Sequence, residues 1–204
     1  PEVLRAATRV FQMAGAQVFI GDSPGVQKTP LVGKKCGLYQ VAEELGATWV
    51  DFTAQKTVRT IRSGRRKVSF TVTAIVDQVD LVVSLPKMKT HTLMYYTGAM
   101  KNLFGLIPSV QKASYHARHP ARNGFARAIV DLNQAVPADF VIMDGIVGME
   151  GPGPGKDGIP KRLGILMASA NPLALDIVAS RIMGYDPLDI PISREALERQ
   201  IWLS

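Results

Sequence analysis

The sequence has almost no cysteine and no long apolar run. Its one cysteine, Cys36, cannot form an internal disulfide or supply the four thiolates of an iron–sulfur cluster. No apolar run reaches about 18 residues, the length that a membrane-spanning helix needs. We therefore expect a soluble, cytoplasmic protein that has no membrane partner and binds no iron–sulfur cluster by itself.

The composition is that of a globular protein with an excess of positive charge. Hydrophobic residues make up 47% of the 204 positions and charged residues 20%, which excludes wholesale disorder and collagen-like repetition. Lysine and arginine number 24 against 17 acidic residues, and the net charge of +7 favours anionic partners. The basic stretch 59–67 has too few aromatic residues for a base-stacking platform, so nucleic acid is not an expected partner.

The chain opens with Pro1 instead of methionine and enters an amphipathic pattern at once. We expect one α/β domain over residues 1–204 that is an excised segment of a longer protein.

Helical periodicity predicts helices, and short apolar or β-branched runs predict strands. Residues 56–61 and 67–72 alternate polar and apolar side chains around a turn, which predicts an antiparallel hairpin with a basic face. The expected helices are 4–14, 41–46, 121–136 and 171–183, and the expected strands are 17–20, 48–52, 80–85, 140–143 and 163–168.

The alternation of strands and helices predicts a three-layer α/β sandwich with a mostly parallel sheet and a small antiparallel hairpin. In such folds, ligands bind beyond the carboxyl ends of the strands. Three unusual loops follow predicted strands, at residues 21–25, 86–91 and 144–160. We expect a parallel sheet to bring these loops to one rim.

The segment 85–108 combines basic and polar side chains with an apolar stretch. Lys87, Lys89 and His91 are spaced two residues apart and would share one face of an extended chain. Lys101 and Asn102 follow a possible helix start at residues 97–98. Together they predict a cationic pocket that holds a phosphate or carboxylate, or stabilises an oxyanion. A solvated basic loop is an equal alternative. The side chains are Lys87, Lys89, His91, Lys101 and Asn102.

Two histidines, His116 and His119, stand three residues apart and would chelate a metal on a helix. However, Pro120 favours a loop, and no carboxylate or cysteine pattern accompanies the histidines. We therefore assign no metal ligand, and a proton-transfer role for His116 or His91 stays open.

The glycine- and proline-rich stretch GPGPGKD, at residues 151–157, partly resembles a Walker phosphate loop. Glu150 stands where the first glycine should be, and Asp157 replaces the Ser or Thr that holds magnesium, so the stretch is not a P-loop. Gly151 and Gly153 would still allow a ligand to approach the backbone, and Lys156 adds charge. A flexible lid or a wide turn is the alternative.

Three aspartates and Glu150 are candidate acids. Asp22 and Asp144 end predicted strands, where a carboxylate meets a substrate or a metal or caps a turn. Asp176 lies inside a predicted helix, which favours a structural role. No G-x-S-x-G elbow, CxxC pair or Rossmann fingerprint occurs, so the corresponding enzyme classes lose support.

Five motifs in order resemble the domain-of-unknown-function 362 family over nearly the whole chain: GDSPG at 21–25, LPKMKTH at 85–91, TGAMKNLFGLIP at 97–108, DGIVGMEGPGPGKDGIP at 144–160 and NPLALDIVASRIMG at 171–184. The resemblance implies an α/β domain linked to redox metabolism, because many members are joined to a ferredoxin-type module with two four-iron clusters. The cysteines of that module are absent here, as is the family's first strand with its Lys-Pro-Asn segment. The family pattern points to Asp22, Ser23, Lys87, Lys89, His91, Lys101, Asn102, Gly105, Asp144, Glu150, Gly151 and Asp176.

We expect a redox-associated domain that binds an anionic small molecule or cofactor in a pocket lined by Lys, His and Asp. The cofactor itself is not identified, and four-iron clusters would belong to a module outside this chain. The alternative is a non-catalytic module that docks a ferredoxin-type iron–sulfur partner through a basic face at Arg62, Arg65 and Arg66. The catalytic candidates are Lys89, His91, Lys101, Asp22 and Asp144, and the binding candidates are Ser23, Lys87, Asn102, Gly105, Glu150, Gly151, Gly153 and Lys156.

Overall fold

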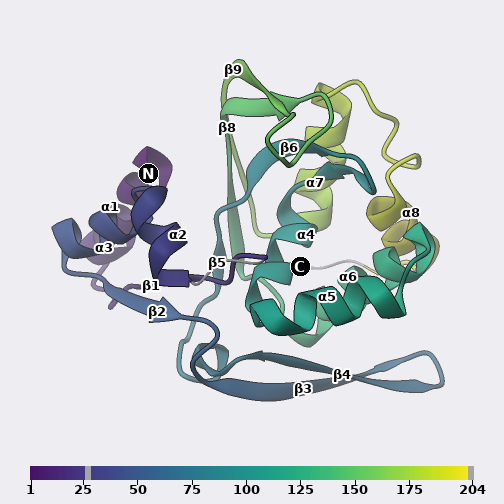
Figure 1. The fold of residues 1–204 in the computed structure, drawn as a ribbon, viewed down its shortest axis with the longest axis horizontal. Helices are drawn as coiled ribbons and strands as arrows, with labels where there is room; N and C mark the ends of the chain where they lie inside the picture. Colours follow the sequence, from purple (N-terminus) through teal and green to yellow (C-terminus); the bar gives the residue numbers. More distant parts are fainter. Residues whose placement is uncertain (26–28, 202–204) are drawn as a thin grey trace. The chain divides into compact units, whose positions relative to one another are not determined.

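A computed structural model describes residues 1–25 and 29–201 (Figure 1). The chain divides into two compact units, each assembled from three segments. Six segments in alternation mean that the chain passes between the units five times. The single domain expected from the sequence stays a prediction. Unit 1 consists of Pro1–Val58, Thr71–Gln78 and Gly105–Ser114, and unit 2 of Arg59–Phe70, Val79–Phe104 and Tyr115–Ser204.

Unit 1 contains a two-stranded parallel sheet whose register runs from Phe19 beside Thr48 to Asp22 beside Asp51. Helix α3 packs against α1, α2 and β2 and buries Val41. It ends at Gly46, whose φ of 63° closes the helix in the left-handed region that glycine adopts without strain. The elements are α1 (Glu2–Met13), β1 (Phe19–Asp22), α2 (Thr29–Lys35), α3 (Leu38–Leu45), β2 (Thr48–Asp51) and the 3-10 helix η1 (Ala74–Asp77).

The helices and strands expected in this region are confirmed, with β1 beginning two residues later than predicted. Helix α2 is not expected from the sequence, because Pro30 and Gly33 are weak helix formers. The expected loop at residues 21–25 is shorter than predicted, since Gly21 and Asp22 belong to β1.

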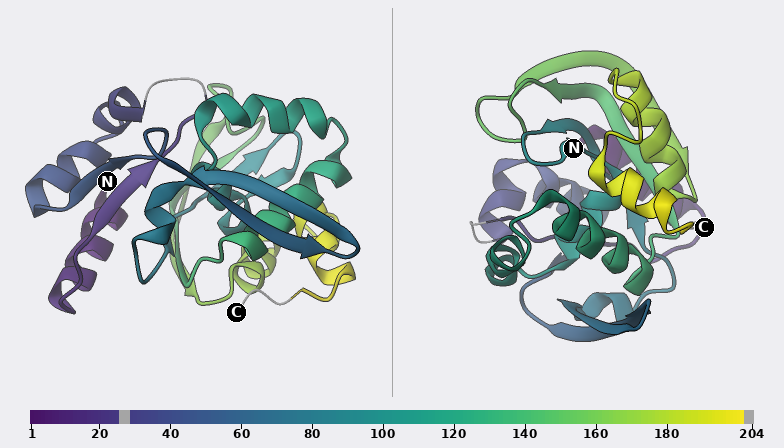
Figure 2. Two further views of the ribbon diagram at one scale, coloured as in Figure 1. Left: turned by 90° about the horizontal axis from the view of Figure 1, so that it is seen from below. Right: turned by 90° about the vertical axis from the view of Figure 1, so that its right-hand side faces the viewer.

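The hairpin of β3 (Lys56–Ser63) and β4 (Arg66–Thr73) is confirmed, and its strands contribute residues to both units. Exposed and partly buried side chains alternate along β3 as the sequence predicts. The two strands form a twisted ribbon (Figure 2). Gly64, with a φ of 59°, lies in the turn that joins them.

Unit 2 is built on a five-stranded mixed sheet in which β8 is central. β5 and β6 pair in parallel with β8, β9 pairs antiparallel with β8, and β7 pairs antiparallel with β6. This arrangement confirms the α/β class, with parallel strands and a small antiparallel hairpin. The strands are β5 (Val83–Ser84), β6 (Lys87–His91), β7 (Tyr95–Thr97), β8 (Phe140–Glu150) and β9 (Ile159–Ser169).

The sequence predicts a buried strand over residues 80–85 and a loop from Pro86. The strand is confirmed but shorter than predicted, and the predicted loop is wrong. Only Val83–Ser84 pairs with β8, and the Leu81 side chain is 58% exposed. Pro86 interrupts the strand because it has no N–H, yet its carbonyl accepts a hydrogen bond from the Asp144 N–H at 2.8 Å. The chain therefore stays extended and continues as β6.

The expected loop over residues 144–160 is also wrong in large part. Residues 144–150 belong to β8, and Ile159 already begins β9. Only residues 151–158 form a connection, and it joins two antiparallel strands. The prediction that three loops carry the candidate side chains is therefore wrong for residues 87–91 and 144–150, which lie on strands.

The helices of unit 2 cover the large methionine and aromatic side chains of its core. Helix α4 packs against α6 and α7, and α6 packs against α8 (Figure 1). The expected helix over residues 171–183 is confirmed as α7, and Asn171 caps it by accepting a hydrogen bond from the Ala174 N–H at 3.0 Å. The helices are α4 (Ala99–Asn102), α6 (Arg122–Ala135), α7 (Pro172–Ile182) and α8 (Pro191–Glu198). The 3-10 helix η2 (Leu103–Leu106) and helix α5 (Ser109–Arg118) belong partly to each unit.

Within residues 1–25 and 29–201, every helix is too short or too polar to cross a membrane.

Candidate functional site

Four basic side chains gather in unit 2, and we call them the cationic cluster: Lys89, His91, Lys101 and His116. Lys89 and His91 alternate along β6 with Met88, whose side chain is fully buried on the opposite face. Lys101 comes from α4 and His116 from α5. The extended chain and the short helix that the sequence predicts for this segment are thus confirmed.

The ring of His91 is fixed by the backbone of the turn after β6. Its Nδ1 accepts hydrogen bonds from the N–H groups of Leu93 and Met94, at 3.1 and 3.3 Å. A neutral imidazole that accepts at Nδ1 carries its proton on Nε2. His91 therefore presents an Nε2–H donor.

Burial, helped by neighbouring cationic groups, lowers the pKa of His91 to about 4. In order of effect these neighbours are Lys101, His116 and Lys89. Positive charge on these neighbours disfavours protonation of the imidazole, because like charges repel more strongly where water is scarce. The imidazole is therefore neutral near pH 7.

Aromatic rings line the cluster beneath Lys101 and His116. The Lys101 Nζ lies 5.9 Å from the ring centroids of both Phe104 and Phe125. The His116 ring stacks on Phe125, with centroids 4.6 Å apart. Burial and the charge of Lys101 lower the pKa of His116. His116 thus lies on a helix, and the predicted loop at this position is wrong.

Helix α4, which carries Lys101, is anchored by Asp176 of α7. The carboxyl oxygens of Asp176 accept hydrogen bonds from the N–H groups of Ala99 (2.7 Å) and Met100 (2.9 Å). The Tyr96 hydroxyl donates a third bond at 2.8 Å. Burial raises the pKa of Asp176 to about 6, although the three hydrogen bonds act to lower it. Asp176 is a positioning residue for the cluster, in line with the structural role expected for it.

Lys87 and Asp144 form an ion pair between β6 and β8. The Lys87 Nζ lies 2.8 Å from Oδ2 of Asp144, and both side chains are partly exposed. The other oxygen of Asp144 accepts a hydrogen bond from the Ile146 N–H at 3.0 Å. The two charges offset each other, so this pair adds little net positive charge.

The remaining candidate binding residues of unit 2 are Asn102 and those in or beside the connection between β8 and β9. The Asn102 amide donates to Ser84 Oγ at 2.9 Å, and Glu150 pairs with Lys161 at 3.3 Å. Lys156 and Gly151 are exposed in the connection.

Gly153 has a packing role in this connection. Its carbonyl accepts a hydrogen bond from the Thr92 N–H at 3.0 Å, and a Cβ at position 153 would lie 2.6 Å from the Thr90 carbonyl oxygen. Only glycine permits this approach of the connection to the turn after β6. The ligand-binding role expected for Gly153 stays a prediction.

The remaining candidates come together in unit 1 around Asp22. A Cβ on Gly105 would lie 3.0 Å from the Asp22 carboxylate, and Ser23 Oγ lies 3.1 Å from Ser109 Oγ. The buried Lys112 donates a hydrogen bond to the carbonyl of Ser23. Burial lowers the pKa of Lys112, while the carboxylate of Asp22 acts in the opposite direction.

Lys112 is a residue that sequence reasoning missed. The sequence offers no clear signal for it, because helix α5 is not expected from the sequence and the partner of Lys112 is a backbone carbonyl in a distant segment. Asp22, Ser23 and Gly105 belong to unit 1 and the cationic cluster to unit 2, so their joint action stays a prediction.

Groups of three or more His, Cys, Asp or Glu side chains that could hold a metal ion do not occur among the described residues. His119, the second of the paired histidines, stacks loosely against Tyr115 with centroids 6.4 Å apart.

Unit 2 is an α/β unit, in which helices pack over a mixed sheet and a methionine-rich core. It carries a basic cluster on β6, α4 and α5. The chain belongs to the family described as domain of unknown function DUF362, whose model matches residues 1–181. It is also 33% identical over 192 residues to a thylakoid-associated protein of Synechocystis sp.. The match covers 94% of this chain and 59% of the relative, so the chain spans about three fifths of that protein's length.

Proposed function

We propose that unit 2 binds an anionic small molecule or cofactor through a phosphate or carboxylate group held by the cationic cluster. The observation that carries the proposal is the neutral His91, fixed with its Nε2–H available and surrounded by positive groups. Lys89 and Lys101 supply charge, and His91 supplies a directed hydrogen bond. A bound anion would relieve the repulsion among these groups.

The redox association of this proposal comes from the family resemblance. Within it, Lys89, His91 and Lys101 contact the anion, and Asp144 of the same unit exchanges protons with it. A reducing, cytoplasmic compartment is part of the same proposal, and the single exposed cysteine, Cys36, is compatible with it. Fractionation of cells that express the tagged full-length protein tests the location, and recovery in a membrane fraction would contradict it.

Calorimetric titration with inorganic phosphate and with acetate at pH 7 tests anion binding. We expect Lys101→Ala and Lys89→Ala each to weaken binding at least tenfold, because each removes one charge from the cluster. Lys67→Ala is the matched control, since Lys67 is exposed on β4 and the change alters the net charge equally. Binding that is absent in the wild type, or equally strong in all variants, overturns the proposal.

A second candidate function is the docking of a ferredoxin-type partner domain. It is favoured by the exposed side chains of Arg62, Arg65 and Arg66 around the turn of the β3–β4 hairpin. Such a complex with an acidic ferredoxin would weaken with salt, survive Lys101→Ala and be lost when all three arginines are replaced by glutamine. A complex that depends on Lys101 instead, or no complex at low salt, counts against docking by the hairpin.

A further inference from the structure

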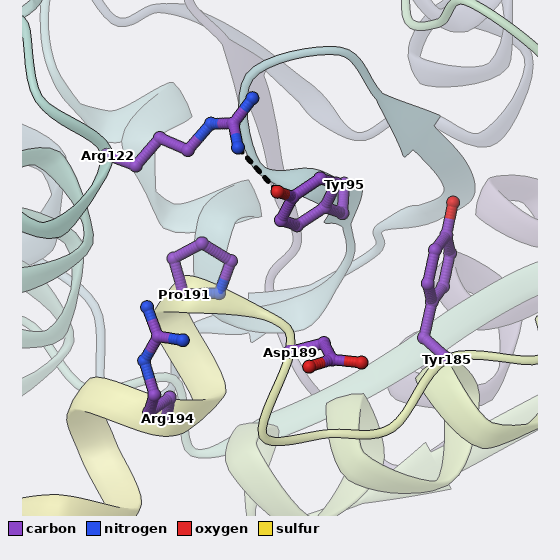
Figure 3. Close-up of a pocket in the computed structure, with 6 residues that line it drawn as sticks. All are labelled: Tyr95, Arg122, Tyr185, Asp189, Pro191 and Arg194. Atoms are coloured by element: carbon purple, nitrogen blue, oxygen red, sulfur yellow. Dashed lines mark hydrogen bonds between the residues drawn. The ribbon is translucent and has the colours of Figure 1, made fainter.

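A cavity of about 370 Å³ lies in unit 2, apart from the residues of the cationic cluster. Its lining comes from three parts of the chain: Tyr95 at the start of β7, Arg122 at the start of α6, and the segment from Tyr185 into α8 (Figure 3). This volume falls within the range of pockets that hold small molecules. Two tyrosines and two arginines in one pocket suit a ligand that is both flat and anionic.

Among the described residues, neither arginine of the pocket forms an ion pair with a carboxylate. The Arg122 guanidinium donates to the hydroxyl of Tyr95. Arg194 donates to the Leu188 carbonyl at 3.4 Å and to Asn123 Oδ1 at 3.2 Å, both neutral acceptors. Asp189 is the single acidic residue of the lining, so positive charges outnumber negative ones by two to one.

The backbone of Tyr95 adopts an unusual conformation at the edge of the pocket. Its φ is 61°, in the left-handed region that a bulky side chain rarely adopts. Arg122 secures the ring, with its guanidinium 4.7 Å from the ring centroid as well as the hydrogen bond. Strain of this kind persists at ligand sites, where the surrounding structure enforces it. Figure 3 shows Tyr185 across the pocket from Arg122.

We propose that this pocket binds a small molecule that combines a planar aromatic ring with a carboxylate or phosphate group. The ring lies against Tyr95 and Tyr185, because aromatic pairs stack favourably. The anionic group lies at Arg194, whose fork of N–H donors matches a carboxylate or phosphate. Asp189 accepts a hydrogen bond from an N–H or O–H on the ligand. The proposal does not depend on anion binding by the cationic cluster.

Calorimetric titration with benzoate and with phenyl phosphate tests this site and separates a carboxylate ligand from a phosphate ligand. We expect at least one probe to bind, and Arg194→Gln and Tyr185→Ala each to weaken that probe tenfold or more. Cyclohexanecarboxylate, which has the charge of benzoate without its flat ring, should bind at least fivefold more weakly than benzoate. Arg181→Gln is the matched control, because Arg181 is exposed on α7 and does not line the pocket.

Thermal unfolding of each variant shows whether it is folded. Tyr185→Phe is a second test, because it keeps the aromatic ring, and its binding should stay within threefold of the wild type. Repeating the titrations in the Lys101→Ala background, in which anion binding by the cationic cluster is weakened, separates this pocket from the cluster. Arg194→Gln should weaken binding tenfold or more in that background as well. The proposal is overturned if neither probe binds at millimolar concentration, or if a probe binds equally well to folded Arg194→Gln.

Discussion

His91 and Asp176 both hold their neutral forms over a wider pH range than the free side chains do. The cause is the same for both, since burial disfavours the charged form of any titratable group. The effects on stability have opposite signs, however, because one group is neutral when it has lost a proton and the other when it holds one. Each sign leads to a separate prediction.

For His91, the folded-state pKa of about 4 lies below the unfolded value of 6.5. As the pH falls, the unfolded chain takes up the proton first, so the stability that His91 contributes is complete above pH 6.5 and is lost toward pH 4. NMR titration of the imidazole C–H signals measures this pKa. We expect Lys101→Ala to raise it, because a neighbouring charge is gone, and the control Lys67→Ala to leave it unchanged. A wild-type value near 6.5 would contradict the arrangement of the cluster.

For Asp176, the folded-state pKa of about 6 lies above the ordinary value of 3.8. The unfolded chain loses the proton first as the pH rises, so the stabilisation is complete below pH 3.8 and is lost through pH 6. The difference amounts to about 3 kcal/mol. The difference between wild type and Asp176→Asn in urea denaturation from pH 4 to pH 7 measures it, because His91 contributes equally to both. Asp176→Asn should remove this pH dependence, and an unchanged slope in the variant would show that another group causes it.

Much of the cationic cluster follows from sequence spacing alone. The spacing by two of Lys89 and His91 predicts a shared strand face, and the turn before α4 predicts the placement of Lys101. The hydrogen bonds that fix the His91 ring could not be foreseen, because they depend on the geometry of the turn at Leu93 and Met94. Lys112 was hidden for a similar reason, since its partner is a backbone carbonyl in a distant segment.

Among the elements, α4 depends most clearly on one small residue. A Cβ on Gly98 would lie 1.8 Å from the Tyr96 hydroxyl and 2.3 Å from Asp176 Oδ1. We expect Gly98→Ala to cost about 3 kcal/mol of unfolding free energy in urea, because the anchor of α4 must move. It should weaken anion binding as well, since Lys101 moves with the helix.

Gly155→Ala is the control for this prediction, because a Cβ at position 155 meets nothing within 4 Å. Its unfolding free energy should stay within about 0.5 kcal/mol of the wild type. Equal stability of the two variants would mean that Asp176 and Tyr96 are not held where the structure places them.

Strong local patterns predicted most elements, whereas pairing direction was not readable from the sequence. Residues 163–168 are apolar whether their neighbour runs parallel or antiparallel, so the antiparallel pairing of β9 with β8 could not be distinguished in advance. The extended course through Pro86 was missed for another reason. A proline ends strand pairing only at its own N–H, and here the hydrogen bond to its carbonyl continues the sheet.

At the scale of the whole molecule, Arg199 joins three distant parts of unit 2. Its guanidinium lies 2.8 Å from Asp131 of α6 and 3.1 Å from Ser63 at the end of β3, just after α8 ends. The Asp131 side chain is only 4% exposed. We expect Arg199→Ala to lower the unfolding free energy by about 3 kcal/mol, because a buried carboxylate loses its counter-charge.

Urea denaturation measures this loss, and adding Asp131→Asn to Arg199→Ala should restore part of it. Arg9→Ala is the matched control, since the side chains of Arg9 and Glu44 are 59% and 43% exposed and their ion pair should contribute less than about 1 kcal/mol. A double variant that is less stable than Arg199→Ala alone would argue against an unpaired charge as the cause.

The alternation of the chain between two units has a consequence for its biosynthesis. Unit 1 needs residues 105–114 as well as the first 58, so it cannot be complete until residue 114 has left the ribosome. By then, two segments of unit 2 have also been translated. Since neither unit is one continuous stretch of the chain, a single proteolytic cleavage cannot release either of them intact.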